Sequence, residues 1–191
     1  MDNNLKILNH LGKHIRESFT MHELSKLVSI PYATFYRDIN KMPDLISKEK
    51  KGNNILVKLK SSNKSLLPYL SVSSEAEKKE YLEKYPIIKK IDNEINTEDI
   101  VVLFGSYAKE KQTSKSDIDI LIINKKGDKT IYFSKHELLY KKKINPIFIM
   151  NSEFKEMLKD KDENIGKQAL KNHIILNNSY KFWECVLDAI R

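Results

Sequence analysis

Apolar residues recur at helical spacing along the first forty positions of the chain. Leu8, Leu11 and Ile15 predict an amphipathic helix over residues 4–15. Thr20 and Glu23 form a capping box, in which each side chain satisfies a free backbone donor of the other residue, so a second helix is predicted to start there. Its buried stripe is Leu24, Leu27 and Val28.

A turn at Ser29-Ile30-Pro31 separates this helix from a third one, which runs to about Met42 and turns Phe35, Ile39 and Met42 inward. Two strand-like runs then flank Gly52 and Asn53, residues that tolerate the positive φ of a hairpin turn. These strands are Leu45–Glu49 and Ile55–Leu59.

The pattern changes near residue 61. The polar segment Lys60–Ser65 marks a boundary, and residues 61–73 are predicted to form a linker. Ser74 with Glu77 makes a capping box that opens the next helix. Pro86 kinks or restarts that helix because proline lacks the donor that a helix interior needs. Strand-like runs and a final helix follow: Ile100–Phe104, Asp117–Ile123, Ile144–Met150, and a last stripe of Trp183, Val186, Leu187 and Ile190.

Three helices followed by a basic hairpin resemble a winged helix-turn-helix over residues 3–60. The predicted fold class is therefore α+β: a winged helix-turn-helix at residues 1–60, a linker at 61–73, and a small α/β domain at 74–191 with a short mixed sheet and C-terminal helices.

A unit of this kind places its third helix in the major groove of DNA and its hairpin near the phosphate backbone. The predicted DNA-binding residues are Tyr32, Thr34, Tyr36, Arg37 and Asn40 on the outer face of the helix, and Lys48, Lys50 and Lys51 at the hairpin. The alternative is that this unit docks a protein and that its lysines serve solubility.

Composition narrows the choice of partner. The 191 residues include 34 Lys and Arg against 26 Asp and Glu, a formal net charge of +8. Residues 1–60 contain 11 Lys and Arg and 6 Asp and Glu, so +5 of the net charge of +8 lies in this region. This concentration of positive charge favours double-stranded DNA as the partner. No apolar run approaches the roughly 18 residues of a membrane span, and one cysteine excludes a disulfide scaffold, so we expect a cytoplasmic protein that does not contact a membrane.

The most informative stretch lies at residues 100–124. A buried strand ends in Gly105 and Ser106, where a backbone without Cβ can approach a phosphate and a helix start offers free amides. In the next strand Asp117 and Asp119 are two residues apart, hence on one face. Two adjacent carboxylates repel each other unless a cation such as Mg²⁺, which prefers oxygen ligands, lies between them.

These residues resemble the signature of the polymerase-β-like nucleotidyltransferases, and most closely that of the minimal nucleotidyltransferase branch, G-S-x-A-R-G-x5-S-D-x-D. Gly105, Ser106, Ala108, Ser116, Asp117 and Asp119 match it without a gap. The resemblance implies nucleotide binding by Gly105, Ser106, Lys109 and Ser116, and Mg²⁺ binding and catalysis by Asp117 and Asp119. Pyrophosphate would leave as a nucleotide passes to an acceptor hydroxyl.

The chain departs from that pattern twice. Lys109-Glu110 replaces the family's Arg-Gly, and a lysine lacks the bidentate fork of arginine. Asn145 falls where the family has its third carboxylate, which in active members helps to hold the metal and activate the acceptor. Glu137 and Glu153 are the candidates to replace it from elsewhere.

Two hypotheses follow. The first is an enzyme that binds a nucleoside triphosphate, with ATP as the first candidate, and transfers its nucleotidyl group to an acceptor, which by analogy with some members of the branch can be a protein. The second is a DNA-binding transcriptional regulator whose nucleotidyltransferase domain senses a ligand or dimerises without turnover. A homodimer is compatible with both. His10 and His14 are interpreted as ordinary helix residues and Cys185 as a packing residue.

Overall fold

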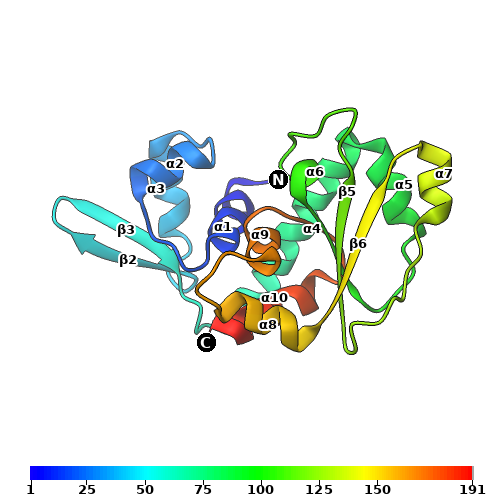
Figure 1. Cartoon of the computed structure of the whole chain (residues 1–191). Coiled ribbons are helices and arrows are strands. Elements are labelled where there is room, and N and C mark those ends of the chain that lie inside the picture. Colours follow the sequence, from blue (N-terminus) through cyan, green and yellow to red (C-terminus); the bar gives the residue numbers. More distant parts are fainter. Residues whose placement is uncertain (191) are drawn as a thin grey trace. The chain divides into compact units, whose positions relative to one another are not determined.

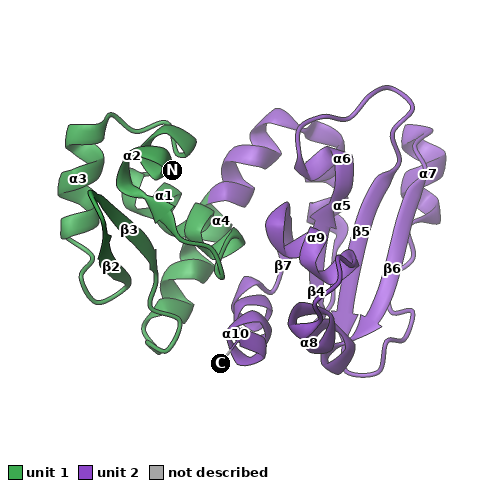
Figure 2. Cartoon of the chain, turned by 60° about the vertical axis from the view of Figure 1, so that its left-hand side comes forward, with its two compact units in different colours: residues 1–76, 191 green, residues 77–190 purple. Residues whose placement is uncertain are grey.

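The computed structural model describes residues 1–190, which form an α+β protein of two compact units. Unit 1 comprises residues 1–76 and unit 2 residues 77–190 (Figure 2). Within these residues no helix is both long enough and apolar enough to cross a membrane.

Unit 1 combines helices with a three-stranded antiparallel sheet whose strand order is β1-β3-β2 (Figure 1). The elements are α1 (Asn3–Lys13), β1 (Phe19–Thr20), α2 (Met21–Leu27), α3 (Tyr32–Asn40), β2 (Ile46–Lys51) and β3 (Asn54–Leu59). The predicted helices and hairpin are all present, whereas the two-residue strand β1 was not predicted, since two residues carry no periodicity.

The capping box and the hairpin turn of unit 1 form as the sequence predicts, whereas Leu27, predicted to be buried in α2, is 51% exposed. The Glu23 amide donates to Thr20 Oγ1 at 3.2 Å and the Thr20 amide donates to Glu23 Oε2 at 3.4 Å, which completes the capping box of α2. Gly52 adopts a φ of +60° between β2 and β3. These contacts fix where α2 begins and where the hairpin turns.

The core of unit 1 is apolar, with one buried carboxylate at its edge. Asp38 of α3 accepts hydrogen bonds from Lys41 Nζ and from Asn3 Nδ2 of α1, each at 3.1 Å. The Lys41 and Asn3 bonds lower the pKa of Asp38 and tie α1 to α3. The apolar core itself consists of buried side chains that include Ile7, Leu8, Leu11, Leu24, Phe35, Ile39 and Val57.

Helix α4 (Leu66–Lys84) corrects the prediction that a helix starts at Ser74 after a linker. Residues 66–73 are helical, with Leu66 and Leu70 fully buried. The Ser71 and Ser73 hydroxyls donate to carbonyls within the helix, at 3.0 and 2.8 Å. A serine-rich sequence therefore resembles a linker, although its polar groups are satisfied inside a helix.

Unit 2 is built on a four-stranded mixed sheet of order β6-β5-β4-β7, in which β5 and β6 are parallel and the other pairs antiparallel. Its strands are β4 (Ile100–Phe104), β5 (Ile118–Asn124), β6 (Ile144–Met150) and β7 (Ile174–Asn177). Its helices after α4 are α5 (Pro86–Glu94), α6 (Gly105–Ala108), α7 (Ser134–Tyr140), α8 (Asn151–Lys159), α9 (Ile165–Lys171) and α10 (Ser179–Ile190). Pro86 opens α5, as expected from its missing donor, and β5 begins one residue later than predicted.

Side chains of the sheet alternate between two apolar layers. Ile118, Ile120 and Ile122 of β5 join a buried cluster that includes Ile88 and Ile91 of α5. Successive strand residues point to opposite faces, so Asp117 and Asp119 fall on the face opposite that cluster. Helices α8 and α10 pack together through Phe154 and Phe182, whose ring centroids are 5.6 Å apart.

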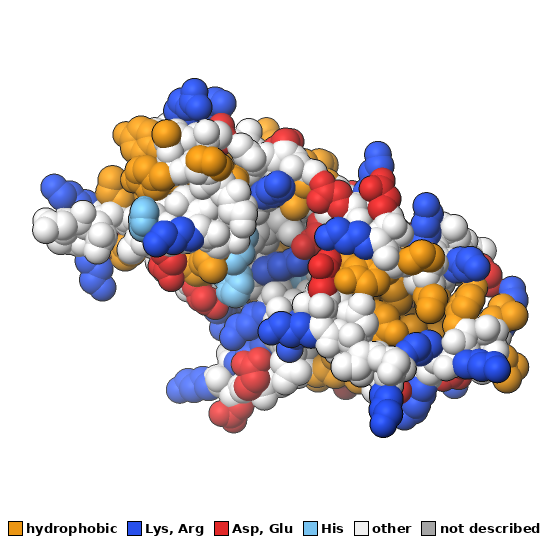
Figure 3. Space-filling model, turned by 90° about the horizontal axis from the view of Figure 1, so that it is seen from above, with side chains coloured by type: hydrophobic (Ala, Val, Ile, Leu, Met, Phe, Trp, Pro, Cys, Tyr) orange, Lys and Arg blue, Asp and Glu red, His pale blue; other side chains and the backbone are white. Residues whose placement is uncertain are grey.

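The surface of unit 2 carries exposed apolar side chains near α7. Tyr132, Leu138 and Leu139 are the most exposed large apolar residues of this unit, and Figure 3 shows hydrophobic side chains gathered at the end that carries α7. Cys185, by contrast, is buried in α10, and burial raises the pKa of its thiol. This agrees with a packing role.

His10 of α1 is held in an environment that opposes its protonation. Its ring lies against those of His14 and Phe19, with centroid distances of 4.7 and 5.4 Å. Among residues 1–190 no hydrogen-bond partner reaches its buried Nε2. Burial, followed by the charge of His14, lowers the pKa of His10 to about 4.

The lowered pKa of His10 predicts that the folded protein loses stability in acid. Between pH 6.5 and about 4 the unfolded chain protonates at this position while the folded chain does not, so stability falls as the pH is lowered through this window and is fully retained above it. His10→Gln should therefore reduce the loss in melting temperature between pH 7 and pH 4.5, measured by circular dichroism. His22→Gln, a change at an exposed histidine, is the control, and equal pH profiles for wild type and His10→Gln would contradict the assignment.

Candidate active site

The candidate site forms where one end of β4 meets the first residues of β5 and β6. Phe104 at the end of β4 pairs with Asp119 of β5, and Asp119 pairs on its other side with Asn145 of β6. Antiparallel pairing brings the end of β4 to the start of β5, and parallel pairing brings the start of β6 to the same edge. The turn at Gly105, the Asp-x-Asp pair and Asn145 are thereby neighbours.

Gly105 is pressed against the Asp119 carboxylate. Its φ is +71°, a left-handed conformation that favours glycine. A Cβ at this position would lie 2.2 Å from Asp119 Oδ2 and 3.1 Å from its Cγ. Only glycine therefore lets the backbone after β4 run directly beside this carboxylate.

Hydrogen bonds to backbone carbonyls hold the short helix α6 in place. The Lys111 amide donates to the Ser106 carbonyl at 3.0 Å, and the buried Tyr81 hydroxyl of α4 donates to the Tyr107 carbonyl at 2.9 Å. Burial raises the pKa of Tyr81, so this hydroxyl remains a donor at all physiological pH values. The Gly105-Ser106 backbone is thus positioned before any ligand binds.

Each aspartate of the pair has a partner on β6 or next to it. Asn145 Nδ2 donates to Asp119 Oδ1 at 3.3 Å, and Lys143 Nζ lies 3.4 Å from Asp117 Oδ2. The sequence analysis did not single out Lys143. Lys143 precedes Asn145 by two residues just as Asp117 precedes Asp119, but this spacing indicates a contact only once the parallel register of β5 and β6 is known.

The other predicted nucleotide-binding residues have different surroundings. Ser116 Oγ accepts the Thr113 amide at 2.9 Å and lies 3.3 Å from Thr113 Oγ1, so its hydroxyl shapes the loop before β5. Lys109 ends α6 and is exposed. Glu110 beside it has a φ of +52° and pairs with Lys84 at 3.4 Å, which directs its charge toward α4.

Neither glutamate considered in place of the third carboxylate is free for that role. Glu137 Oε1 accepts the Ile144 amide at 2.9 Å, and Glu153 Oε2 accepts the Met150 amide at 2.7 Å. Across residues 1–190 no group of three or more His, Cys, Asp or Glu side chains is placed to hold a metal. The groups that can bind a cation here are the carboxylates of Asp117 and Asp119, oxygen ligands that suit Mg²⁺, while Asn145 of β6 turns its Nδ2 donor toward Asp119.

In unit 1 the residues predicted to contact DNA lie on α3 and on the hairpin. Tyr32 and Tyr36 are 45% and 48% exposed, with ring centroids 6.5 Å apart. Arg37 is exposed, and its Nη2 lies 3.4 Å from Thr34 Oγ1. Lys48 of β2 donates to Asn40 Oδ1 and so joins the hairpin to the end of α3, while Lys50 and Lys51 are exposed on β2.

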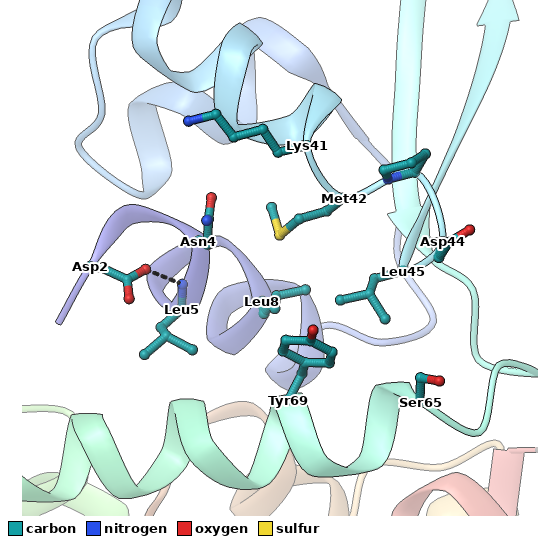
Figure 4. A pocket seen from close by; sticks show the side chains of 11 residues that line it. Asp2, Asn4, Leu5, Leu8, Lys41, Met42, Asp44, Leu45, Ser65 and Tyr69 are labelled. Atoms are coloured by element: carbon teal, nitrogen blue, oxygen red, sulfur yellow. Dashed lines mark hydrogen bonds between the residues drawn. The ribbon is translucent and has the colours of Figure 1, made fainter.

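Unit 1 also contains a cavity of about 450 Å³ between α1, the segment that joins α3 to β2, and the start of α4. Figure 4 shows Leu8, Met42, Leu45 and Tyr69 around the same space. Two charged groups at its rim are engaged, since Asp2 caps α1 through the Leu5 amide and Lys41 pairs with Asp38. Asp44 also lines the cavity, together with Asn4 and Ser65, so its lining is both polar and apolar.

The contact between Gly105 and Asp119 generates a prediction about stability. Gly105→Ala should lower the free energy of unfolding by about 2–4 kcal/mol, because it adds a clash to the cost of a left-handed alanine. Gly52→Ala is the matched control, since its φ is +60° and nothing lies within 4 Å of the added Cβ, so it should cost only about 1–2 kcal/mol.

Urea unfolding of both variants measures the difference. The Gly105→Ala variant should recover part of its loss when Asp119→Ala removes the carboxylate that it meets. Equal losses for Gly105→Ala in the wild-type and Asp119→Ala backgrounds would show that the two residues do not compete for space.

Comparison with known proteins agrees with this geometry. The family model described as polymerase beta, nucleotidyltransferase matches residues 76–181, which include α6, both aspartates and β6. Searches of curated proteins and of solved structures give no match. Because the family match covers more than half of the chain, the protein belongs to the polymerase β nucleotidyltransferase family.

Proposed function

We propose that unit 2 binds a nucleoside triphosphate together with Mg²⁺ and transfers its nucleotidyl group to an acceptor hydroxyl, and that unit 1 tethers this activity to DNA. The observation that carries the proposal is the glycine backbone held directly beside the Asp119 carboxylate. A phosphate bound at Gly105-Ser106 would then lie next to a carboxylate-bound cation.

Asp117 and Asp119 are the residues that would hold Mg²⁺. They share one face of β5, and the Asp117 side chain is 41% exposed, so a hydrated ion can reach it. Bound there, the cation would neutralise charge on the triphosphate. The exposed amide groups and hydroxyl at Gly105-Ser106 would hold the phosphates in position, which is the main catalytic contribution in phosphoryl-type transfers.

In the transfer step an acceptor oxygen forms a bond to the α-phosphorus while the bond to the bridging oxygen breaks and pyrophosphate leaves with that electron pair. The acceptor hydroxyl loses its proton in the same step. Asn145, where the family has a carboxylate, carries no basic atom, so water would receive the proton and transfer would be slow.

The same residue favours a second candidate function. With an amide at position 145, hydrogen-bonded to Asp119, unit 2 can bind a nucleotide without turning it over. The protein would then be a DNA-binding regulator whose response depends on nucleotide and Mg²⁺.

For unit 1 we propose a winged helix-turn-helix that binds double-stranded DNA. Its element order is helix, strand, two helices and hairpin, and α3 presents tyrosine, arginine and asparagine side chains outward. Lys48, held against Asn40, and Lys50 and Lys51 give the hairpin a positive edge for phosphates. Without these outward side chains on α3 and these lysines on the hairpin, the positive charge of unit 1 would be explained more simply as a contribution to solubility.

Titration calorimetry with ATP tests the nucleotide site. We expect heat of binding that requires Mg²⁺ and is lost in the Asp117→Asn/Asp119→Asn variant, because an amide binds Mg²⁺ far more weakly than a carboxylate. The control variant Asp128→Asn/Asp162→Asn removes two exposed carboxylates elsewhere on unit 2 and should bind as wild type. Undiminished Mg²⁺-dependent binding by the first variant would exclude the two aspartates from the site.

Pyrophosphate release in the presence of ATP and Mg²⁺ then separates the two candidate functions. Release by wild type above that of the Asp117→Asn/Asp119→Asn variant supports transfer. Tight binding without release supports the regulator.

Fluorescence anisotropy with random duplex DNA tests unit 1. Arg37→Ala should weaken binding and reduce the slope of log Kd against log salt by about 1, because one phosphate or base contact is lost. Arg16→Ala removes an exposed arginine outside α3 and should leave the slope unchanged. If both variants bind like wild type, α3 is not the DNA-contacting helix.

A further inference from the structure

The start of β6 and the residue before it present an amide and a lysine to the two aspartates. The Lys143 carbonyl accepts the Ile118 amide at 2.9 Å, and the next pairs are Ile118 with Ile144 and Asp119 with Asn145. This register sets Lys143 beside Asp117 and Asn145 beside Asp119, at 3.4 and 3.3 Å between side-chain atoms. Each carboxylate therefore lies next to a side-chain N–H donor, the Lys143 ammonium beside Asp117 and the Asn145 amide beside Asp119.

The charge of this arrangement is small. Two carboxylates and one ammonium leave a net charge of −1, and the neutral amide adds nothing. Two divalent cations would be poorly neutralised by such a set, since affinity for hard cations follows the number of charged oxygen ligands. Glu137 and Glu153 are not counted as ligands, because no group of three or more His, Cys, Asp or Glu side chains within residues 1–190 is placed to hold a metal.

The Lys143 ammonium is placed to supply positive charge itself. Its side chain is 70% exposed, and its pairing with Asp117 at the surface is a weak interaction that can be exchanged. A cation bound by Asp117 would take the place of the Lys143 ammonium beside this carboxylate. The flexible lysine side chain would then be free to reach a phosphate oxygen of a bound nucleotide.

Resting on the proposed nucleotide binding, we propose that this site holds one divalent cation per bound triphosphate and that the Lys143 ammonium takes the place of a second one. The cation is bound by Asp117 and Asp119. Asn145 keeps the position beside Asp119 neutral and fills it with a donor, which excludes a further cation there.

Counting bound Mn²⁺ by electron paramagnetic resonance tests this, using the full chain and an ATP analogue whose α–β bridge is methylene so that no turnover occurs. The wild type should bind one Mn²⁺ per bound nucleotide. The Lys143→Ala/Asn145→Asp variant should bind two, because it replaces an ammonium and an amide by a third carboxylate. Two Mn²⁺ in the wild type would overturn the inference.

Nucleotide affinity gives an independent measurement. Lys143→Ala should weaken binding of the analogue about tenfold, as expected for the loss of one ion pair, and Lys143→Arg should retain most of it. Lys126→Ala, the same change at an exposed lysine after β5, is the control. Wild-type affinity in Lys143→Ala would also overturn the inference.

These outcomes are distinct from failure of the proposed function. If the wild type binds no nucleotide with Mg²⁺ or Mn²⁺, the nucleotide site itself is refuted and the inference falls with it. If nucleotide binds but carries two cations or ignores Lys143, only the inference is refuted. Unchanged melting temperatures confirm that the variants are folded.

Discussion

The candidate site depends on one steric constraint, the passage of the backbone at Gly105 beside the Asp119 carboxylate. Pairing of Phe104 with Asp119 leaves no room for a Cβ at the next position, and the φ of +71° is one that glycine adopts without strain. The buried strand β4 fixes the pairing, and Tyr81 fixes the turn that follows it. On the proposed function, the phosphate-binding backbone and the cation-binding carboxylate would both depend on this one contact.

Those parts of the fold and site that depend on neighbouring residues could be predicted from the sequence. The capping box of α2, the hairpin turn at Gly52 and the Asp-x-Asp spacing are all local patterns. The proximity of Lys143 to Asp117 could not be found in this way, since it depends on the parallel register of two strands separated by a long connection. The start of α4 was misjudged because Ser71 and Ser73 satisfy their hydroxyls inside the helix, which composition does not reveal.

The two units use electrostatics in opposite ways. Unit 1 offers exposed lysine and arginine side chains that would contact a polyanion directly, and such contacts weaken as salt is added. Unit 2 offers carboxylates, which repel a triphosphate unless a cation intervenes. On the proposed function, binding to DNA would respond to ionic strength and binding to nucleotide to the supply of divalent metal, so the two events can be controlled separately.

Asn145 is followed by Pro146, and this neighbour determines how durable the amide is. Asparagine ages to aspartate chiefly when the backbone nitrogen of the next residue attacks the side-chain carbonyl and closes a succinimide ring. Proline has no N–H to lose in that attack, so the usual route is closed at this position. The usual ageing reaction of asparagine therefore does not turn residue 145 into a third carboxylate.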